Sequence, residues 1–308
     1  MSERTEKTGT GLLLPSREAL LWADGDLTVV LNAARQAEQA GYDSVWAGDS
    51  LLARPRGEPI ALLAAVAGAT NRVTLGTAVL LPLLRHPLSL AHALATLDRI
   101  AQGRLVVAVG PGAELPGTHA ELTAVGVPSD RRVSAMLNEV ERCKRLWSND
   151  EPGIQLQPTP FQPGGPPIWL GGGGPRMLRL AGTTFDGWLP LSPTADAYAA
   201  GLRTVREAAV QAGRNPDSIP TGVYLTFAVA DTAREAAGEL DEYTKAYYGQ
   251  PAEVMARQMA CHAGTLESAA EWFAGYRAAG AGHLVLRLAR PGLKDYNATV
   301  RQLLDAAR

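Results

Sequence analysis

The sequence predicts a single α/β domain folded as a closed (β/α)₈ barrel. Eight short apolar segments alternate with segments in which apolar residues recur at helical spacing, a pattern typical of parallel sheets. A chain of 308 residues is long for one ordinary domain and normal for eight such units in a barrel. The main alternative is an open dinucleotide-binding sheet, but the first strand ends in Leu14-Pro15-Ser16 and carries no Gly-x-Gly-x-x-Gly fingerprint.

The predicted strands are short runs rich in Val, Leu, Ile and Ala. They cover residues 11–15, 44–47, 73–81, 104–109, 168–171, 187–191, 222–230 and 283–288. The predicted helices cover residues 27–40, 60–68, 88–101, 131–147, 176–181, 196–212, a stretch within 232–259, 266–279 and 293–307. Insertions after the fourth and seventh strands are expected to cover the barrel mouth. Residues 1–10 are expected to form a disordered tail before one domain spanning 11–308.

Composition narrows the function classes. The 29 basic and 31 acidic residues nearly cancel and form no basic run, so we expect neither a nucleic-acid partner nor a membrane partner. Cys143 and Cys261 lie far apart in predicted helical contexts, which favours buried thiols in a reducing compartment over a disulfide or a metal site. The polar N-terminus has no signal core and no apolar run reaches about 20 residues. These features predict a cytoplasmic protein without a metal.

The most informative stretch is Ile168-Trp-Leu-Gly-Gly-Gly-Gly-Pro-Arg176. An apolar strand ends in four glycines, and Pro175 then occupies the first turn of a predicted helix. Glycine lets backbone approach a ligand closely, and a helix N-terminus presents free N–H groups and a favourable dipole to an anion. The stretch therefore predicts a phosphate site. The alternative is a tight turn that only packs the strand against the helix.

Other predicted strand ends carry glycine or polar residues, where a barrel places its active site. The second strand leads to Asp49 and Ser50, and the third contains residues 76–79, Gly-Thr-Ala-Val. The fourth ends in Gly110-Pro-Gly112, with Glu114 and His119 following. Glycines at several strand ends favour a flat ligand lying close to the backbone, with its phosphate at the fifth strand.

The order and spacing of several short motifs resemble those of the bacterial luciferase-like family of flavin- and deazaflavin-dependent oxidoreductases. The resemblance extends from about residue 11 to 305. The matching stretches are residues 37–46, 69–79, 85–87, 96–99, 103–110, 171–178, 181–182, 186–188 and 279–285.

The resemblance implies a (β/α)₈ barrel that binds a reduced flavin or deazaflavin at its mouth. By position, Gly172, Gly173, Gly174 and Arg176 would hold the cofactor phosphate region. Ala78–Val79, within the matching stretch that also contains Gly76 and Thr77, falls where deazaflavin members often have a non-prolyl cis peptide against the ring. Asp49 matches an acidic residue near the ring, and Gly110 and Gly112 match a turn near the substrate.

One departure concerns proton transfer. Many members carry Asp-His or Glu-His after the second strand, whereas this chain has Asp49-Ser50. A hydroxyl forms hydrogen bonds but is a poor acid or base at neutral pH. The candidate catalytic groups are therefore Ser50, Glu114 and His119. The alternative for Glu114 and His119 is a solvated loop charge and a surface imidazole.

The hypothesis favoured by the sequence is coenzyme F420-dependent hydride transfer to or from a small organic substrate. Gly110-Pro-Gly112 and Gly174-Pro-Arg-Met-Leu178 look closer to the deazaflavin branch, and no charged FMN-phosphate clamp is recognisable. The alternatives are an FMN-dependent monooxygenase and, because of Ser50, a non-catalytic barrel that binds a flavin-like ligand. The resemblance also suggests a homodimer.

Three tryptophans and one histidine are interpreted first as structural residues. Trp46, Trp169 and Trp188 fall on or beside strands and are interpreted as core before ring-stacking partners. His283 opens the eighth predicted strand on the stability face of the barrel. Arg287, nearer the other end of that strand, is placed where it can reach a phosphate.

Overall fold

The predicted barrel is confirmed by a computed structural model, which describes residues 9–307. Each strand pairs with its neighbours in parallel. The strands are β1 (Gly9–Leu13), β2 (Ser44–Ala47), β3 (Thr74–Leu80), β4 (Leu105–Val109), β5 (Ile168–Leu170), β6 (Gly187–Trp188), β7 (Gly222–Val229), β8 (Ala260–Gly264) and β9 (His283–Leu288).

The strand order is β6-β5-β4-β3-β2-β1-β9-β7-β8. The ring closes between β6 and β7 through an isolated parallel bridge from Trp188 to Thr221. Backbone bonds support this closure: the Trp188 N–H donates to Pro220 O at 3.0 Å and the Tyr224 N–H to Pro190 O at 3.3 Å. Because β6 has only two residues, it leaves one edge of the C-terminal half of β7 unpaired, and β8 pairs with that edge.

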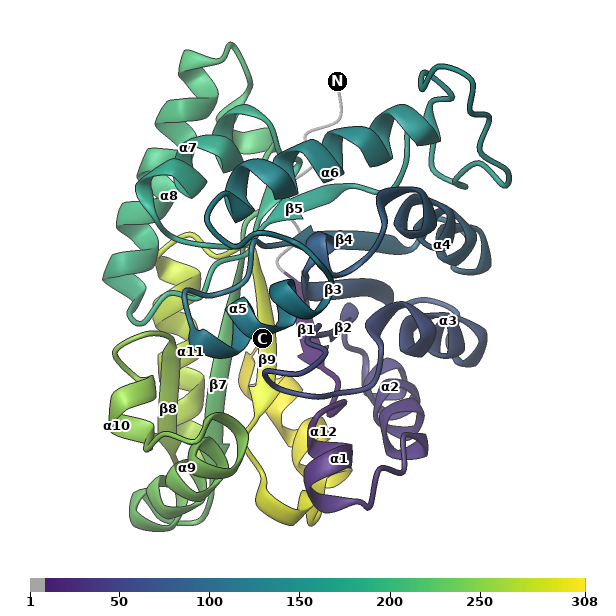
Figure 1. Cartoon of the computed structure of the whole chain (residues 1–308). Helices are drawn as coiled ribbons and strands as arrows, with labels where there is room; N and C mark the ends of the chain where they lie inside the picture. The colour runs from purple at the N-terminus through teal and green to yellow at the C-terminus, as the bar shows by residue number, and fades with distance from the viewer. Residues whose placement is uncertain (1–8, 308) are drawn as a thin grey trace.

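Helices surround the strands (Figure 1). The α-helices are α1 (Glu18–Trp22), α2 (Thr28–Ala40), α3 (Pro59–Ala69), α4 (Pro87–Ile100), α5 (Pro116–Ala124), α6 (Arg132–Trp147), α7 (Pro175–Thr183), α8 (Ala195–Gln211), α9 (Ala233–Tyr248), α10 (Ala252–Met255), α11 (Leu266–Ala278) and α12 (Tyr296–Ala307). Three short 3₁₀ turns also occur: η1 (Pro82–Leu84), η2 (Pro216–Ser218) and η3 (Pro291–Leu293).

Several sequence expectations need correction. β8 lies inside the expected insertion after the seventh predicted strand, so Cys261 is in a strand and not in a helix. β1 begins at Gly9, so residues 9 and 10 belong to the barrel, while residues 1–8 of the expected tail lie outside the described residues. α1 and α5 are short, and the apolar periodicity that reveals longer helices is too brief to mark them.

The core has two layers, because side chains alternate along each strand. Leu12 and Leu14 face the helices, whereas Leu13 faces the barrel interior. Trp46 and Trp169 fill that interior with ring centroids 5.7 Å apart. They confirm the interpretation of these tryptophans as core residues. Trp188 is also buried, in the outer layer, where it stacks on Tyr198.

Both expected insertions reach the barrel mouth. The segment after β4 supplies α5, and the segment after β7 supplies α9. α5 brings Thr118 and Glu121 to the wall of the central cavity, and α9 brings Tyr247 and Tyr248. The insertions therefore determine the shape of the site that the strands support.

Candidate functional site

A cavity of about 420 Å³ lies at the C-terminal ends of the barrel strands. This is the position at which barrels place their active sites. Its wall is formed by Asp49, Ser50, Ala53, Arg54, Arg56, Ala78, Val79, Leu81, Gly110, Pro111, Gly112, Ala113, Thr118, Glu121, Gly171, Gly172, Gly173, Gly174, Met177, Leu189, Leu191, Tyr224, Tyr247, Tyr248 and Arg287.

Val79 projects into a seat made by two glycines. A Cβ at Gly110 would lie 2.8 Å from Val79 Cγ2, and one at Gly171 would lie 2.9 Å from Val79 Cγ1. Both distances are too short for real carbon contacts, so only glycine fits at either position without a shift of Val79. The Ala78–Val79 peptide bond is cis, as the resemblance implied. Together these features place a compact apolar surface on the β3 side of the cavity.

The glycine run forms an open backbone loop ahead of α7. Gly172 has a φ of +107°, which favours glycine. A Cβ at Gly173 or Gly174 would meet no atom within 4 Å, so packing does not explain the glycines there. Gly174 is the N-cap of α7, and no side chain caps it. The first N–H groups of the helix are therefore available to an anion.

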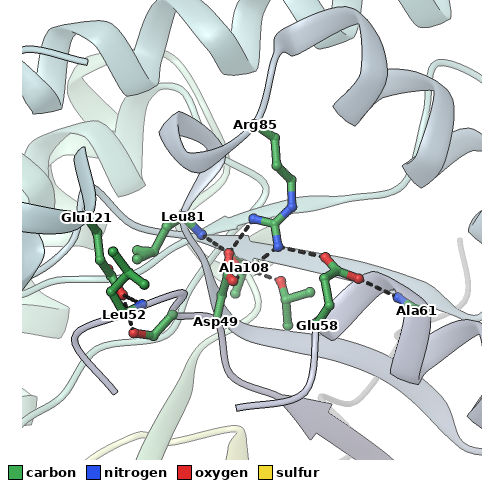
Figure 2. Close-up of polar contacts among 10 residues, drawn as sticks. Asp49, Leu52, Glu58, Ala61, Leu81, Arg85, Ala108 and Glu121 are labelled. Atoms are coloured by element: carbon green, nitrogen blue, oxygen red, sulfur yellow. Dashed lines mark hydrogen bonds and ion pairs between the residues drawn. The ribbon is translucent and has the colours of Figure 1, made fainter. Parts of the chain in front are cut away.

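Asp49 lines the cavity, but its carboxylate is bonded to protein groups outside the cavity wall and at its edge. Arg85 donates to both of its oxygens, at 2.6 and 3.1 Å, and the Leu81 N–H donates at 3.0 Å. The same guanidinium bridges at 2.6 Å to Glu58, which caps α3 through the Ala61 N–H. Figure 2 shows this chain of contacts. Asp49 is thus a wall residue whose carboxylate is held in one orientation.

Ser50 also lines the cavity, and its hydroxyl is hydrogen-bonded to other protein groups. It donates to Glu121 Oε1 at 2.5 Å and accepts from the Arg54 N–H at 2.9 Å. The same Glu121 oxygen accepts from the Leu52 and Ala53 N–H groups at 2.7 Å each, and Leu52 and Glu121 are visible in Figure 2. Glu121 is only 1% exposed. The pair therefore fixes the loop after β2 against α5.

The wall formed by β7, β9 and α9 is aromatic and cationic. Arg287 is buried among four tyrosine rings, and Arg54 and Arg56 approach two of the same rings from the loop after β2. Burial raises the pKa of the Tyr224 and Tyr248 hydroxyls. Both phenols are therefore neutral at physiological pH and can donate hydrogen bonds into the cavity.

Three predicted cofactor residues do not contribute to the cavity wall. A Cβ at Gly76 would lie 2.1 Å from the Trp46 ring, so this glycine makes room for the indole. Thr77 is fully buried and donates to Ala108 O at 2.7 Å. Arg176 is exposed and bonds Ser134 on α6 at 3.2 Å. For these three positions the structure favours structural roles, because each makes its contacts outside the cavity wall.

Glu114 and His119 also lie outside the wall of the cavity. They pair with each other at 2.8 Å, and Glu114 forms a further ion pair with Arg132. Arg132, more than His119, lowers the pKa of Glu114 below its usual range. An exposed ionised carboxylate in such a network is a poor proton donor. The geometry thus favours the alternative stated above, a solvated loop charge and a surface imidazole.

Most of the polar residues that line the cavity are not revealed by the sequence alone. Glu121 and the tyrosines lie on α5, β7 and α9, in or next to insertions without a motif, and Arg54 and Arg56 lie in an irregular loop.

Within residues 9–307, no group of three or more His, Cys, Asp or Glu side chains is arranged to hold a metal ion. No helix in that range has the length and apolar character needed to cross a membrane.

Comparisons with known proteins identify one family and several relatives of this chain. A family model described as luciferase-like monooxygenase matches residues 9–287. The F420-dependent hydroxymycolic acid dehydrogenase of Mycobacterium tuberculosis is 31% identical over 71% of this chain and 64% of that protein. The F420-dependent glucose-6-phosphate dehydrogenase of Kineococcus radiotolerans is 34% identical over 66% of this chain and 64% of that protein. The match thus spans slightly less than two thirds of these relatives.

Solved structures share the fold. An F420-dependent secondary alcohol dehydrogenase, in complex with an F420–acetone adduct, superposes with a TM-score of 0.81 at 21% identity, covering 98% of this chain and 99% of that one. The monooxygenase RslO1 from Streptomyces bottropensis superposes with a TM-score of 0.78 at 24% identity, covering 97% of this chain and 98% of that one.

Proposed function

The chain belongs to the luciferase-like monooxygenase family, and on that premise we propose that it is a coenzyme F420-dependent oxidoreductase acting on a small organic substrate. The observation that carries the proposal is the pairing of two features in one cavity. One is the open glycine loop at the start of α7, and the other is the seated Val79 beside a cis peptide. The names of the sequence relatives support F420 as the cofactor.

The residues present fit such a cofactor. Gly172, Gly173 and Gly174 leave backbone exposed where its phosphate would bind. Ala78 and Val79 offer an apolar surface to its ring, and Gly110 keeps the neighbouring wall flat. F420 supplies or accepts a hydride, while carbon at position 5 of its ring disfavours reaction with oxygen.

The chain's own contribution is orientation and hydrogen bonding. The Ser50 hydroxyl donates its hydrogen bond to Glu121, so it is not placed to protonate a substrate. The neutral hydroxyls of Tyr224 and Tyr248 remain as donors toward a substrate oxygen. Asp49, fixed by Arg85, presents an oriented carboxylate at the β2 side. These roles are proposals that substitution can test.

A paired titration tests the cofactor assignment. The apo protein is titrated with F420 and with FMN while tryptophan fluorescence is followed, because Trp46 and Trp169 lie directly in the barrel. We expect saturation with F420 and binding of FMN weaker by at least about tenfold, equivalent to about 1.4 kcal/mol. The reverse preference would support the FMN-dependent monooxygenase. Binding of F420 without turnover of any substrate would support a non-catalytic ligand-binding barrel.

Gly173→Ala tests the glycine loop as the phosphate site. The added methyl group meets no protein atom within 4 Å, so the fold should tolerate it. We expect F420 affinity to fall by about tenfold or more because the methyl group occupies space next to the exposed amides. Gly238→Ala, on the exposed face of α9 with equally open surroundings, is the matched control. Equal F420 affinity in both variants would place the phosphate elsewhere.

Three broader assignments complete the proposal. Residues 9–307 are proposed to act as one domain, since a single core cluster extends from Leu12 to Ala307. A cytoplasmic location is proposed from the sequence features described above. A homodimer is proposed from the family resemblance, and sedimentation velocity would measure it directly.

A further inference from the structure

Among residues 9–307, Arg287 is a buried cation without an acidic partner. It lies on β9 with 1% of its surface exposed, and it lines the cavity. Its Nε and Nη2 donate to Thr226 Oγ1 at 3.1 and 2.8 Å. None of the ion pairs among the described residues includes it. Buried charges are normally paired, because desolvation of a lone charge is costly.

Tyrosine rings surround this guanidinium. Its central carbon lies 4.6 Å from the Tyr247 ring centroid, 5.0 Å from Tyr248 and 5.1 Å from Tyr224. Such contacts stabilise a cation through the ring quadrupole, but they do not neutralise its charge. The tyrosines therefore make burial of Arg287 tolerable and leave its positive charge in place.

Two further arginines converge on the same rings. The Arg56 guanidinium carbon lies 5.7 Å from the Tyr247 centroid, and that of Arg54 lies 4.7 Å from the Tyr248 centroid. Both line the cavity, and neither belongs to an ion pair among residues 9–307. The Arg17 guanidinium carbon also lies 5.1 Å from the Tyr247 centroid, but Arg17 is outside the cavity wall. Three of the four cations around these two rings therefore line the cavity.

The nearest carboxylates are already engaged. Glu18 accepts a hydrogen bond from Tyr243, behind the Arg287 guanidinium. Asp49 is paired with Arg85, and Glu121 binds backbone N–H groups of the loop after β2. One buried carboxylate behind the tyrosines does not balance three arginines, so this wall carries a net positive charge.

The glycine loop belongs to another part of the cavity wall. In the closed ring, β5 and β9 are separated by β4, β3, β2 and β1 in one direction and by β6 and β7 in the other. The proposed phosphate site at the end of β5 and Arg287 on β9 are therefore on separate strands that are not neighbours. An anion bound by the arginines is thus distinct from the phosphate held by the glycine loop.

We propose that Arg54, Arg56 and Arg287 form the subsite for an oxyanion group of the substrate, so that the substrate class is a small carboxylate- or phosphate-bearing molecule. The fork of N–H donors on arginine matches the oxygens of both groups. Tyr247 and Tyr248 would pack against the carbon skeleton next to the anion. This inference deepens the proposed function and rests on it.

The test compares three probes of one shape that differ in charge: benzoate, phenyl phosphate and benzamide. Each is titrated into the F420-loaded protein, and the absorption spectrum of the bound cofactor is followed. We expect benzoate or phenyl phosphate to bind at least about tenfold more tightly than neutral benzamide, equivalent to about 1.4 kcal/mol. The tighter of the two anions identifies the substrate as a carboxylate or a phosphate. Equal binding of all three probes would overturn the proposal.

Variants assign any charge preference to the arginines. Arg287→Gln should reduce the preference for an anionic probe over benzamide by about tenfold or more, equivalent to about 1.4 kcal/mol. Arg56→Gln should have the same effect, and it carries less risk to folding because Arg56 is only half-buried. Arg287→Lys should restore part of the preference. The control is Arg257→Gln, an exposed arginine outside the cavity wall. Loss of F420 affinity in Arg287→Gln with unchanged anion preference would overturn the proposal, because the arginines would then serve the cofactor.

The two proposals can fail separately. If the wild-type protein binds no F420, the same probes are titrated into the apo protein and tryptophan fluorescence is followed. An anion preference that depends on Arg287 would then retain the subsite and reject the cofactor. Absence of a preference in a protein that does bind F420 would reject the subsite and retain the cofactor.

Discussion

At the scale of single residues, hydrogen-bond partners separate groups available to a substrate from groups committed to the fold. Ser50 and Glu121 both face the cavity, yet each is engaged with the other and with the backbone of residues 52–54. A hydroxyl can donate one hydrogen bond, and here Glu121 accepts it. Exposure to a cavity alone is therefore a poor guide to catalytic function.

Ser50→Ala should act on stability more than on proton transfer. The substitution removes the hydroxyl between Glu121 and the Arg54 N–H, and the free energy of unfolding should fall by about 1–2 kcal/mol. Denaturant titration measures this change, with Ser148→Ala, whose exposed hydroxyl contacts Lys144 O, as the control. Unchanged stability together with a loss of hydride transfer of about a hundredfold would instead make Ser50 the catalytic acid.

The contact between Gly110 and Val79 allows a double-mutant test. Gly110→Ala places a methyl group 2.8 Å from Val79 Cγ2 and should destabilise the protein by about 1–3 kcal/mol through overpacking. Val79→Ala removes the opposing methyl groups, so the double variant should recover most of that loss. Thermal unfolding of the four proteins measures the coupling. Additive effects would show that the two side chains do not oppose each other.

At the scale of elements, β9 has a structural end and a functional end. His283 opens the strand and bonds Ser44 of β2 at 2.7 Å across β1, beside the Trp46 ring. Arg287, four residues later, faces the cavity. The even spacing places both side chains on the inner face of the barrel. Position along one strand thus distinguishes a residue that supports the barrel from one that faces the ligand.

His283 should make stability depend on pH. Burial, only partly opposed by Asp43, lowers the pKa of His283 to about 4 from its ordinary value of 6.5. The unfolded chain therefore takes up the proton first as the pH falls. The stabilising contribution is complete above pH 6.5 and is lost as the pH falls from 6.5 through 4, by about 3 kcal/mol in total.

Denaturant titrations between pH 7 and pH 4 measure this effect. His283→Gln keeps a hydrogen-bonding side chain without a titrating group, so it should flatten the pH profile. His92→Gln, on the exposed side of α4, is the matched control and should keep the wild-type slope. An identical slope in all three proteins would assign the pH dependence to other groups.

At the scale of the whole molecule, one continuous core joins the two ends of the chain. It extends from Leu12 on β1 to Ala307 on α12, and β1 pairs with β9. The ring closes through few contacts between β6 and β7, so the insertion containing α9 and β8 completes the wall on that side. The same insertion supplies Tyr247 and Tyr248, which links closure of the barrel to formation of the site.

A shared core predicts cooperative unfolding. Tryptophan fluorescence, to which Trp46 and Trp169 of the barrel interior contribute, and far-ultraviolet circular dichroism should give coincident denaturant transitions. Saturating F420 should shift both transitions together, because a ligand that binds only the folded state stabilises the whole unit. An early transition in one signal would indicate that part of the chain folds as a separate unit.

By itself, the sequence determined the barrel, the alternation of its strands and helices outside the β8 region, and the glycine loop ahead of α7. These features are local: apolar runs, helix caps and glycine at a strand end are encoded by neighbouring residues. The cis peptide at Ala78–Val79 followed from the family resemblance, because one residue pair does not reveal it. The tertiary structure alone decided which polar side chains face the cavity. Ser50 meets Glu121, and Arg287 meets the tyrosines of α9, only because insertions distant in sequence fold over the mouth, and such long-range contacts leave no periodic pattern in the chain.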